Sequence, residues 1–231
     1  ASSLSITSGT KTWVYDDTVH TDKTYSIDFG SQTYTATDNG NGTFSYVLST
    51  GDTVTITPSG IGASGVRNVS DTAASNNKFT YTVTNSSNYS SISTVYGKLS
   101  VTPAAITVKS SDTPTVSKVY DGTTAGTSFV GTDDYVFEGL QGDDTLQLSA
   151  FTATYDSADA SQYDLNNNWT AGASKVTMTG LAINDGNYTL VTTTFDIAAK
   201  ITVATLVINV VNKSVTYGGS YSFYGTSGLK Y

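Results

Sequence analysis

The 231-residue sequence contains no cysteine and a single histidine, His20. Without cysteine the chain can form no disulfide and has no thiol nucleophile, and without a second histidine a structural zinc site of cysteine and histidine ligands is excluded. Serine–histidine–aspartate chemistry would have to run through His20, and the chain has no G-x-S-x-G motif. We therefore expect His20 to be a solvated loop residue and the protein not to be an enzyme.

Charged residues are also scarce, at 13% of the chain, and they leave a net charge of −8. Phosphate groups and anionic lipid surfaces attract basic stripes, which this sequence lacks, so nucleic acid and anionic membranes are not expected as partners. No apolar run reaches the length of a membrane-spanning helix, and we expect no membrane insertion. The chain has no initiator methionine and no signal peptide, so we expect a mature segment of something longer.

Residues that favour strands and turns are abundant, with 16 tyrosines and 21 glycines. Nearly all acidic residues are aspartate, which prefers turns, and Glu138 is the only glutamate. No window shows a convincing helical period, although residues 159–165 could form a short helical turn. Period-two alternation predicts strands in these ranges: 33–37, 43–48, 53–57, 79–84, 145–148, 151–155, 175–179 and 188–195. Phe79, Tyr81 and Val83 are expected to point to one face of their strand, and Val176 and Met178 are expected to face inward.

These patterns predict an all-β fold in which sheets pack face to face, as tandem immunoglobulin-like β-sandwich modules arranged end to end. A β-grasp arrangement is the alternative if a helix lies in 60–75 or 156–165. Similar segments start at Lys11, Lys118 and Lys213, and they divide the chain into three units. The predicted units are residues 1–106, residues 107–203, and the opening strands of a third module, 204–231. The short junction LSVTPAAITV predicts a fairly stiff line of neighbouring units.

The heptad Lys118–Thr124 is the clearest local motif. Tyr120 ends a strand, and we expect it to bury its ring and keep its hydroxyl in water. Asp121 and Gly122 supply the turn, because the carboxylate can accept from backbone amides and glycine tolerates positive φ. Together with Lys118 these residues form a structural turn motif rather than a catalytic site.

The second unit resembles the YDG repeat of large bacterial surface proteins and haemagglutinin-like adhesins. Four segments carry the resemblance in the order of that family: Lys118–Thr124, Gly139–Asp144, Val176–Leu181 and Gly186–Leu190. The segment Val215–Ser220 resembles the start of the related MBG repeat. The first unit resembles the family only at its ends, and Asp17 stands where the family has glycine. The resemblance implies an extracellular tandem array on a wall-attached adhesin of a Gram-positive bacterium, with neighbouring repeats as partners and no catalytic residues or cofactors.

An aromatic and amide cluster is the best candidate for a ligand site, because sugars stack on exposed rings flanked by amide groups. The alternative is that these aromatic side chains pack structurally. The candidate residues are Trp169, Tyr163, Asn167 and Asn168. Host or matrix glycans or glycoproteins would be the partners.

Three other kinds of chemistry are weaker candidates. Calcium prefers clustered oxygens, but no EF-hand spacing is present; the candidate ligands are Asp143, Asp144, Asp156 and Asp159. Glycosidase chemistry would need Glu138 opposite an aspartate. An intramolecular Lys–Asn isopeptide bond would start from Lys11 or Lys118, although a lysine at a strand end is normally exposed.

The sequence therefore favours a structural stalk segment of a cell-surface adhesin, extracellular and attached to the cell wall, that projects a binding region and contributes to host or matrix attachment. The alternative is a carbohydrate-binding adhesive module that recognises glycans through its Trp/Tyr/Asn surface.

Overall fold

Strands make up nearly all of the regular structure in the computed structural model, which describes residues 2–208 and 217–218. In these residues the helical elements are the four-residue helix α1 (Ile61–Ser64) and four short 3-10 turns. The all-β prediction is confirmed. The predicted segments at Lys213 and Val215–Ser220, and most of the predicted third unit, lie outside the described residues.

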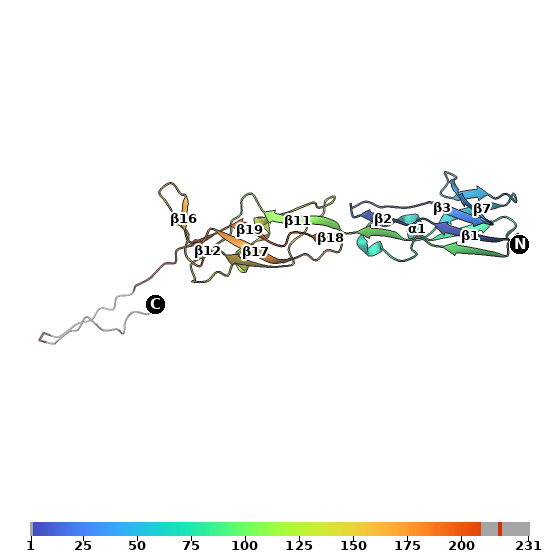
Figure 1. Cartoon of the computed structure of the whole chain (residues 1–231). Helices are drawn as coiled ribbons and strands as arrows, with labels where there is room; N and C mark the ends of the chain where they lie inside the picture. Colours follow the sequence, from blue (N-terminus) through green and yellow to red (C-terminus); the bar gives the residue numbers. More distant parts are fainter. Residues whose placement is uncertain (1, 209–216, 219–231) are drawn as a thin grey trace.

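The strand pairings fall into two groups, which we name the N-terminal block (residues 2–102) and the C-terminal block (residues 104–202). No pairing in the described part of the chain joins a strand of one block to a strand of the other. Figure 1 shows the two blocks one after the other along an elongated molecule, with the blue N-terminal strands at one end. The polypeptide passes directly from one block into the next at Pro103, which lies between β10 (Leu99–Thr102) and β11 (Ala104–Ser110).

The N-terminal block contains two four-stranded sheets. The first has the order β4 (Gln32–Thr35), β3 (Tyr25–Phe29), β1 (Ser3–Ser8), β9 (Ser91–Val95). The second has the order β5 (Thr37–Asp38), β6 (Phe44–Val47), β7 (Thr53–Pro58), β8 (Phe79–Val83). Side chains of both sheets form one buried cluster, in which Leu4 and Ile6 meet Val54 and Ile56. Burying one face of each sheet against the other makes this part a two-layer packing.

The C-terminal block repeats the two-layer principle with smaller sheets. One has the order β13 (Tyr135–Glu138), β11, β18 (Tyr188–Leu190), and the other has the order β14 (Ala150–Tyr155), β17 (Lys175–Ala182), β19 (Phe195–Ala198). The core between them includes Val108, Tyr155, Val176, Met178 and Ile197. The inward orientation predicted for Val176 and Met178 is confirmed, because neither is exposed.

Both blocks end with a pair of parallel strands. In the N-terminal block β2 (Lys11–Val14) pairs with β10, and in the C-terminal block β12 (Ser117–Val119) pairs with β20 (Lys200–Thr202). A two-stranded hairpin, β15 (Gln162–Tyr163) and β16 (Trp169–Ala171), stands out from the body of the C-terminal block (Figure 1).

Several local predictions were wrong. Residues 145–148 form no strand, and the amide of Leu148 donates to the hydroxyl of Tyr135 at 3.2 Å and not to the backbone of a neighbouring strand. The range 188–195 is interrupted, so that β18 and β19 join different sheets. The expected helical turn at 159–165 contains β15 instead, and α1 is the only α-helix in the ranges 60–75 and 156–165. The β-grasp alternative depends on a helix in these ranges, where the structure has only the four-residue α1 and the 3-10 turn Val69–Asp71.

A third buried cluster lies at the junction of the two blocks, separate from the two block cores. It contains Tyr15, Val66 and Leu99 of the N-terminal block together with Ile106 and Tyr188 of the C-terminal block. The junction therefore has an apolar core of its own. No helix in the described residues has the length and apolar character needed to cross a membrane.

Candidate functional site at the junction

The turn that follows β2 or β12 has the same backbone construction in both blocks. Asp121 Oδ1 accepts from the amide and hydroxyl of Thr123, each at 2.9 Å, and Asp16 Oδ1 accepts from Thr18 at 3.0 and 2.7 Å. The next residue has positive φ in both turns, 74° at Gly122 and 61° for the aspartate that replaces glycine in the first block. Only glycine adopts this region freely, so the first block adopts the same turn with a less favourable residue.

Lys118 and Tyr120 take positions opposite to those predicted. The Lys118 side chain is completely buried, and its Nζ donates to Asp121 Oδ1 and to the carbonyl of Thr123, both at 2.7 Å. Tyr120 is 45% exposed. Alternation in β12 directs Lys118 inward, where its ammonium lies 5.2 Å from the centre of the Tyr155 ring, whereas Tyr120 lies beyond the strand end, outside the block core. No asparagine is among the hydrogen-bond partners of Lys118 Nζ, and Lys11 is exposed.

Tyr15, the counterpart of Tyr120 in the first block, is buried and reaches into the second block. Its hydroxyl donates to Asp144 Oδ2 at 2.8 Å, and the hydroxyl of Tyr188 donates to the same oxygen at 2.6 Å. The two rings meet edge to face, with centroids 5.2 Å apart. We name Tyr15, Asp144 and Tyr188 the junction triad; one carboxylate oxygen joins a residue of each block.

The ionisation of the junction triad reflects this shared oxygen. The hydrogen bond from Tyr188, followed by that from Tyr15, lowers the pKa of Asp144 below its usual value. Burial, followed by the hydrogen bond to Asp144, raises the pKa of Tyr188 to about 12. The pKa of Tyr15 is raised for the same two reasons, burial being the larger. At neutral pH the triad is therefore one carboxylate held by two neutral phenols.

A second polar contact lies between the blocks at Asn187. The backbone amide of Val69 donates to Asn187 Oδ1 at 2.9 Å, and Asn187 Nδ2 donates to Asn68 Oδ1 at 3.1 Å. The carbonyl of Asn187 also accepts from the amide of Ala104 at 2.9 Å, which holds the first strand of the C-terminal block. Asn187 thus contacts the loop before β8 through its side chain and the first strand of the C-terminal block through its backbone carbonyl.

The loop that carries Asp144 approaches the first block closely at Gly142. This residue has φ +55°, and a Cβ placed on it would lie 2.4 Å from Asp17 Oδ2. Asp17 is held in place by Arg67, whose Nε donates to Asp17 Oδ1 at 3.0 Å. Glycine is therefore needed at position 142 both for its backbone angle and for the contact between the blocks.

His20 differs from the prediction of a solvated loop residue. Its ring stacks on Trp13 with centroids 4.9 Å apart, and its Nε2 lies 2.9 Å from Asp16 Oδ1 and 3.2 Å from Thr18 Oγ1. Activation of a hydroxyl by histidine uses the two ring nitrogens for two different partners. Here the carboxylate and the hydroxyl share one nitrogen, an arrangement that fixes the turn and does not form a catalytic triad.

The other acidic candidates lie in separate surroundings. Glu138 forms an ion pair with Lys109, which lowers the pKa of Glu138, whereas a general acid needs a raised pKa. Asp156 accepts from Ser174 and the backbone of Lys175, and Asp143 and Asp159 belong to different loops. No group of three or more potential metal ligands occurs within residues 2–208 and 217–218, so the four proposed calcium ligands do not form one site.

The predicted ligand-site residues do come together on the hairpin β15–β16. Tyr163 pairs directly with Trp169 across the two strands, and their exposed fractions are 46% and 50%. The turn between them includes Asn167 at φ 63° and Asn168, whose amide donates to Asp164 at 2.8 Å. Directly paired residues project from the same face of a hairpin, so the two rings share one exposed face.

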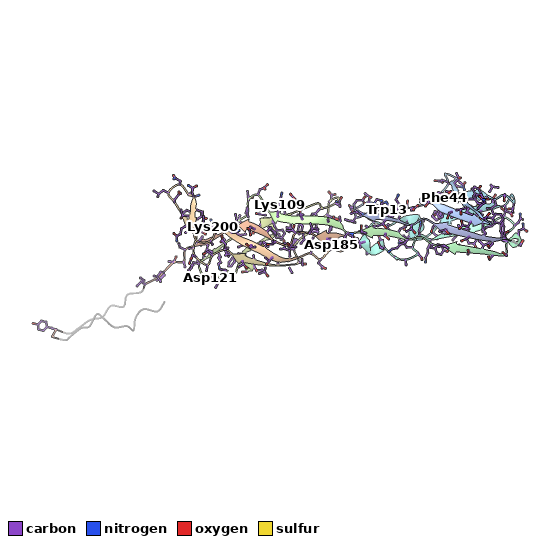
Figure 2. The ribbon with its side chains drawn as sticks, in the orientation of Figure 1. Trp13, Phe44, Lys109, Asp121, Asp185 and Lys200 are labelled. Atoms are coloured by element: carbon purple, nitrogen blue, oxygen red, sulfur yellow. The ribbon has the colours of Figure 1, made fainter. Side chains whose placement is uncertain are left out.

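The sequence did not identify the junction as a site. Sequence reasoning places Asp144 among the candidate calcium ligands, and Asn187 and Tyr188 enter only as members of the segment Gly186–Leu190 that carries the family resemblance. Arg67 drew no structural prediction, although it is the only arginine and lies 50 residues from the aspartate that it binds. The sequence signal that could have found the junction is the recurrence of an Asn-Tyr pair near the end of each block, at residues 88–89 and 187–188. In Figure 2 Trp13 and Asp185 lie on either side of the junction, and Asp121 and Lys200 lie at the far end of the C-terminal block.

The comparisons with known proteins agree with the resemblance for the second block. The model of the family described as YDG domain matches residues 102–195, which supports a YDG-type domain in this part of the chain. No curated protein matches the chain, and no solved structure matches it. The predicted unit boundaries at 106 and 203 stay predictions.

Proposed function

We propose that this chain is a structural stalk segment of an extracellular bacterial surface adhesin. In this function tandem β modules hold one another in line and project a binding region from the wall of a Gram-positive cell, and they contribute in this way to host or matrix attachment. The YDG-type domain at 102–195 supports the family context. The chemistry of the site supports holding rather than bond-making, because its carboxylate and phenols are engaged with one another.

The observation that carries the proposal is the construction of the junction. An apolar cluster holds the two blocks together without fixing a direction, since hydrophobic burial is non-directional. The bonds to Asp144 and Asn187 add direction, because hydrogen bonds weaken steeply as their angle departs from linearity. Two such contacts at separate points of one interface oppose bending and twisting, as a load-bearing array of modules requires.

Distances between spin labels placed in the two blocks would test this function. Because the chain has no cysteine, Thr80→Cys on β8 and Thr152→Cys on β14 would be labelled alone, and both positions are exposed. We expect one narrow distance distribution that Tyr15→Ala broadens and that the control Tyr120→Ala leaves unchanged. A broad distribution in the parent protein would mean that the junction is not stiff, and it would contradict the proposed stalk function.

A second candidate function is favoured by the hairpin. Tyr163 and Trp169 are paired and half-exposed next to the amide groups of residues 166–168, which is the chemistry of a glycan-binding platform. Host or matrix glycans or glycoproteins would be its partners. Glycan-array binding by the parent protein should be lost in Trp169→Ala and kept in Phe129→Ala, which removes another exposed ring. Binding that survives Trp169→Ala would exclude this platform.

A further inference from the structure

We call the contact between two consecutive modules a joint, so that the junction described above is the first joint. We propose that the C-terminal end of the C-terminal block is a second joint of the same construction, in which Tyr120 has the role that Tyr15 has at the first joint. Its occupant is a β module of the kind formed by residues 104–202, with a first strand that begins at Ala204. This inference rests on the proposed stalk function and deepens it by naming the partner of this surface.

The strand register supports the equivalence of the two ends. Val101 pairs with Trp13 in the first block, and Ile201 pairs with Lys118 in the second. The hydrogen bonds that follow are also the same. The amide of Tyr15 donates to the carbonyl of Thr102 at 2.9 Å, and the amide of Tyr120 donates to that of Thr202 at 2.8 Å.

The hydroxyl contacts extend this match. Thr102 Oγ1 donates to the carbonyl of Trp13, and Thr202 Oγ1 donates to the carbonyl of Lys118, both at 3.2 Å. The backbone thus presents Tyr15 and Tyr120 in the same way at the end of each block. It also places Trp13, and not Lys11, at the position that Lys118 occupies.

The surroundings of the two tyrosines differ. Tyr15 is 4% exposed because residues of the following block cover it, whereas Tyr120 is 45% exposed. Tyr120 lines a groove of about 670 Å³ together with Ser161, Gln162, Val203 and Leu206. This groove lies where the first joint has its apolar cluster, directly against the chain that leaves the block.

The departing chain has the pattern of the strand that starts the C-terminal block. Ala104, Ile106 and Val108 alternate along β11 and are buried. Ala204, Leu206 and Ile208 repeat the spacing of these apolar residues, although Val207 stands where β11 has Thr107, and Leu206 and Ile208 are 76% and 64% exposed. Residues two apart share one face of a strand, so this segment presents an apolar face that suits the first strand of a further module.

The first joint also defines the chemistry of the occupant. It must bring a carboxylate that is held by the tyrosine of an Asn-Tyr strand, as Asp144 is held by Tyr188. The same pair occurs in the N-terminal block, where the hydroxyl of Tyr89 donates to Asp52 Oδ2 at 2.8 Å. A carboxylate that accepts from the tyrosine of an Asn-Tyr pair therefore occurs in both blocks, and in the first joint the tyrosine turn of the neighbouring block supplies a further donor.

A chimeric polypeptide would test the inference. Residues 1–203 are followed by a second copy of residues 104–203. A single residue then separates the last strand of one block from the first strand of the next, as Pro103 does at the first joint. The added copy contains a complete block core. Thr152→Cys in each copy provides one spin-label pair across the new joint. We expect a distance distribution as narrow as that of the Thr80–Thr152 pair across the first joint.

Two substitutions of Tyr120 in the first copy, and one control substitution, complete the experiment. Tyr120→Ala should broaden the distribution and Tyr120→Phe should broaden it less, whereas Phe129→Ala, which removes an aromatic ring of similar exposure outside the groove, should leave the distribution unchanged. A broad distribution in the parent chimera, or no effect of Tyr120→Ala, would overturn the inference. The proposed stalk function would be unaffected by that result if the distance distribution of the Thr80–Thr152 pair is narrow. A broad Thr80–Thr152 pair would instead count against the stalk function itself.

Discussion

Removing the hydroxyl group of Tyr15 should lower the free energy of unfolding by a measurable amount, because that hydroxyl joins the two blocks. In Tyr15→Phe the ring stays packed against Tyr188, and the bond to Asp144 Oδ2 is lost together with the longer contact of 3.2 Å to Asp17 Oδ1. Hydrogen bonds to charged groups contribute about 1.5–3 kcal/mol to stability. Since Asp144 keeps the bond from Tyr188, we expect the free energy of unfolding to fall by about 1.5 kcal/mol, at the lower end of that range.

Truncation of the whole side chain should cost more. The ring of Tyr15 is 4% exposed and forms an edge-to-face pair. Replacing a buried aromatic residue by alanine costs about 3–5 kcal/mol, so we expect about 4 kcal/mol for Tyr15→Ala. The matched variants at the other end, Tyr120→Phe and Tyr120→Ala, change an exposed side chain, and we expect changes of roughly 0.5 kcal/mol or less for the former and below about 1 kcal/mol for the latter.

Urea unfolding followed by tryptophan fluorescence would measure these differences. Trp13 lies at the junction, whereas Trp169 lies on the exposed hairpin, so a Trp169→Phe background leaves a single reporter at the site of interest. A double-mutant cycle with Asp144→Asn would then isolate the bond, and we expect a coupling energy above about 1 kcal/mol for residues in direct contact. Equal losses in Tyr15→Phe and Tyr120→Phe, or zero coupling with Asp144→Asn, would refute the argument that this bond holds the joint.

Three further predictions follow from the same contacts. Gly142→Ala should lower stability more than Gly180→Ala, because both have positive φ but only Gly142 also faces the opposite block; equal losses in thermal unfolding would contradict this. The folded-state pKa of Asp144 is lowered, so the contribution of this carboxylate to the free energy of unfolding should be complete above the unfolded pKa of about 3.9. This contribution should be lost as the pH falls through the folded-state pKa. Asp144→Asn should therefore make the free energy of unfolding less dependent on pH in the acid range. Lys118→Ala should cost about 2 kcal/mol through lost packing and the unpaired Thr123 carbonyl, whereas Lys11→Ala should be nearly neutral in chemical denaturation; similar effects of the two substitutions would contradict the burial of Lys118.

Much of the fold could be predicted from the sequence, because alternation of side chains reports directly which face of a strand is buried. Val176 and Met178 were placed inward correctly for this reason. The method failed where pairing depends on a distant partner. Residues 145–148 alternate well but have no strand beside them, and the continuous pattern of 188–195 could not show that its two halves enter different sheets.

The turn motif shows a second limit of sequence reasoning. Asp121 and Gly122 were placed correctly, since an aspartate that accepts from the amide two residues later and a glycine at positive φ are local properties. The predicted burial of Lys118 and Tyr120 was wrong for both residues, because residue type alone favours a buried tyrosine and an exposed lysine. Register decided otherwise, and the buried ammonium is tolerated because a carboxylate and a carbonyl oxygen contact it.

The junction was the least predictable part, because its members are far apart in the sequence: Tyr15 and Asp144 are separated by 129 residues. No local pattern relates them. Repetition is the property that could have done so, since a residue that ends one module meets the beginning of the next wherever modules follow one another directly. A comparison of corresponding ends, rather than of corresponding cores, is therefore the way to find such contacts from sequence.

The construction of the junction also explains why a polar contact would be used where an apolar one would hold equally well. An interface made only of Leu99, Val66 and Ile106 could slide or rotate at little cost, because dispersion and hydrophobic burial change gradually with position. A carboxylate oxygen that accepts from one hydroxyl of each block has only a narrow range of positions that satisfies both donors. Leaving a buried donor unsatisfied costs about 1–3 kcal/mol, so each rotated arrangement is penalised even when its apolar contacts are equally extensive. On this reasoning the apolar cluster supplies most of the attraction, and the junction triad selects one orientation from among those that the cluster would allow.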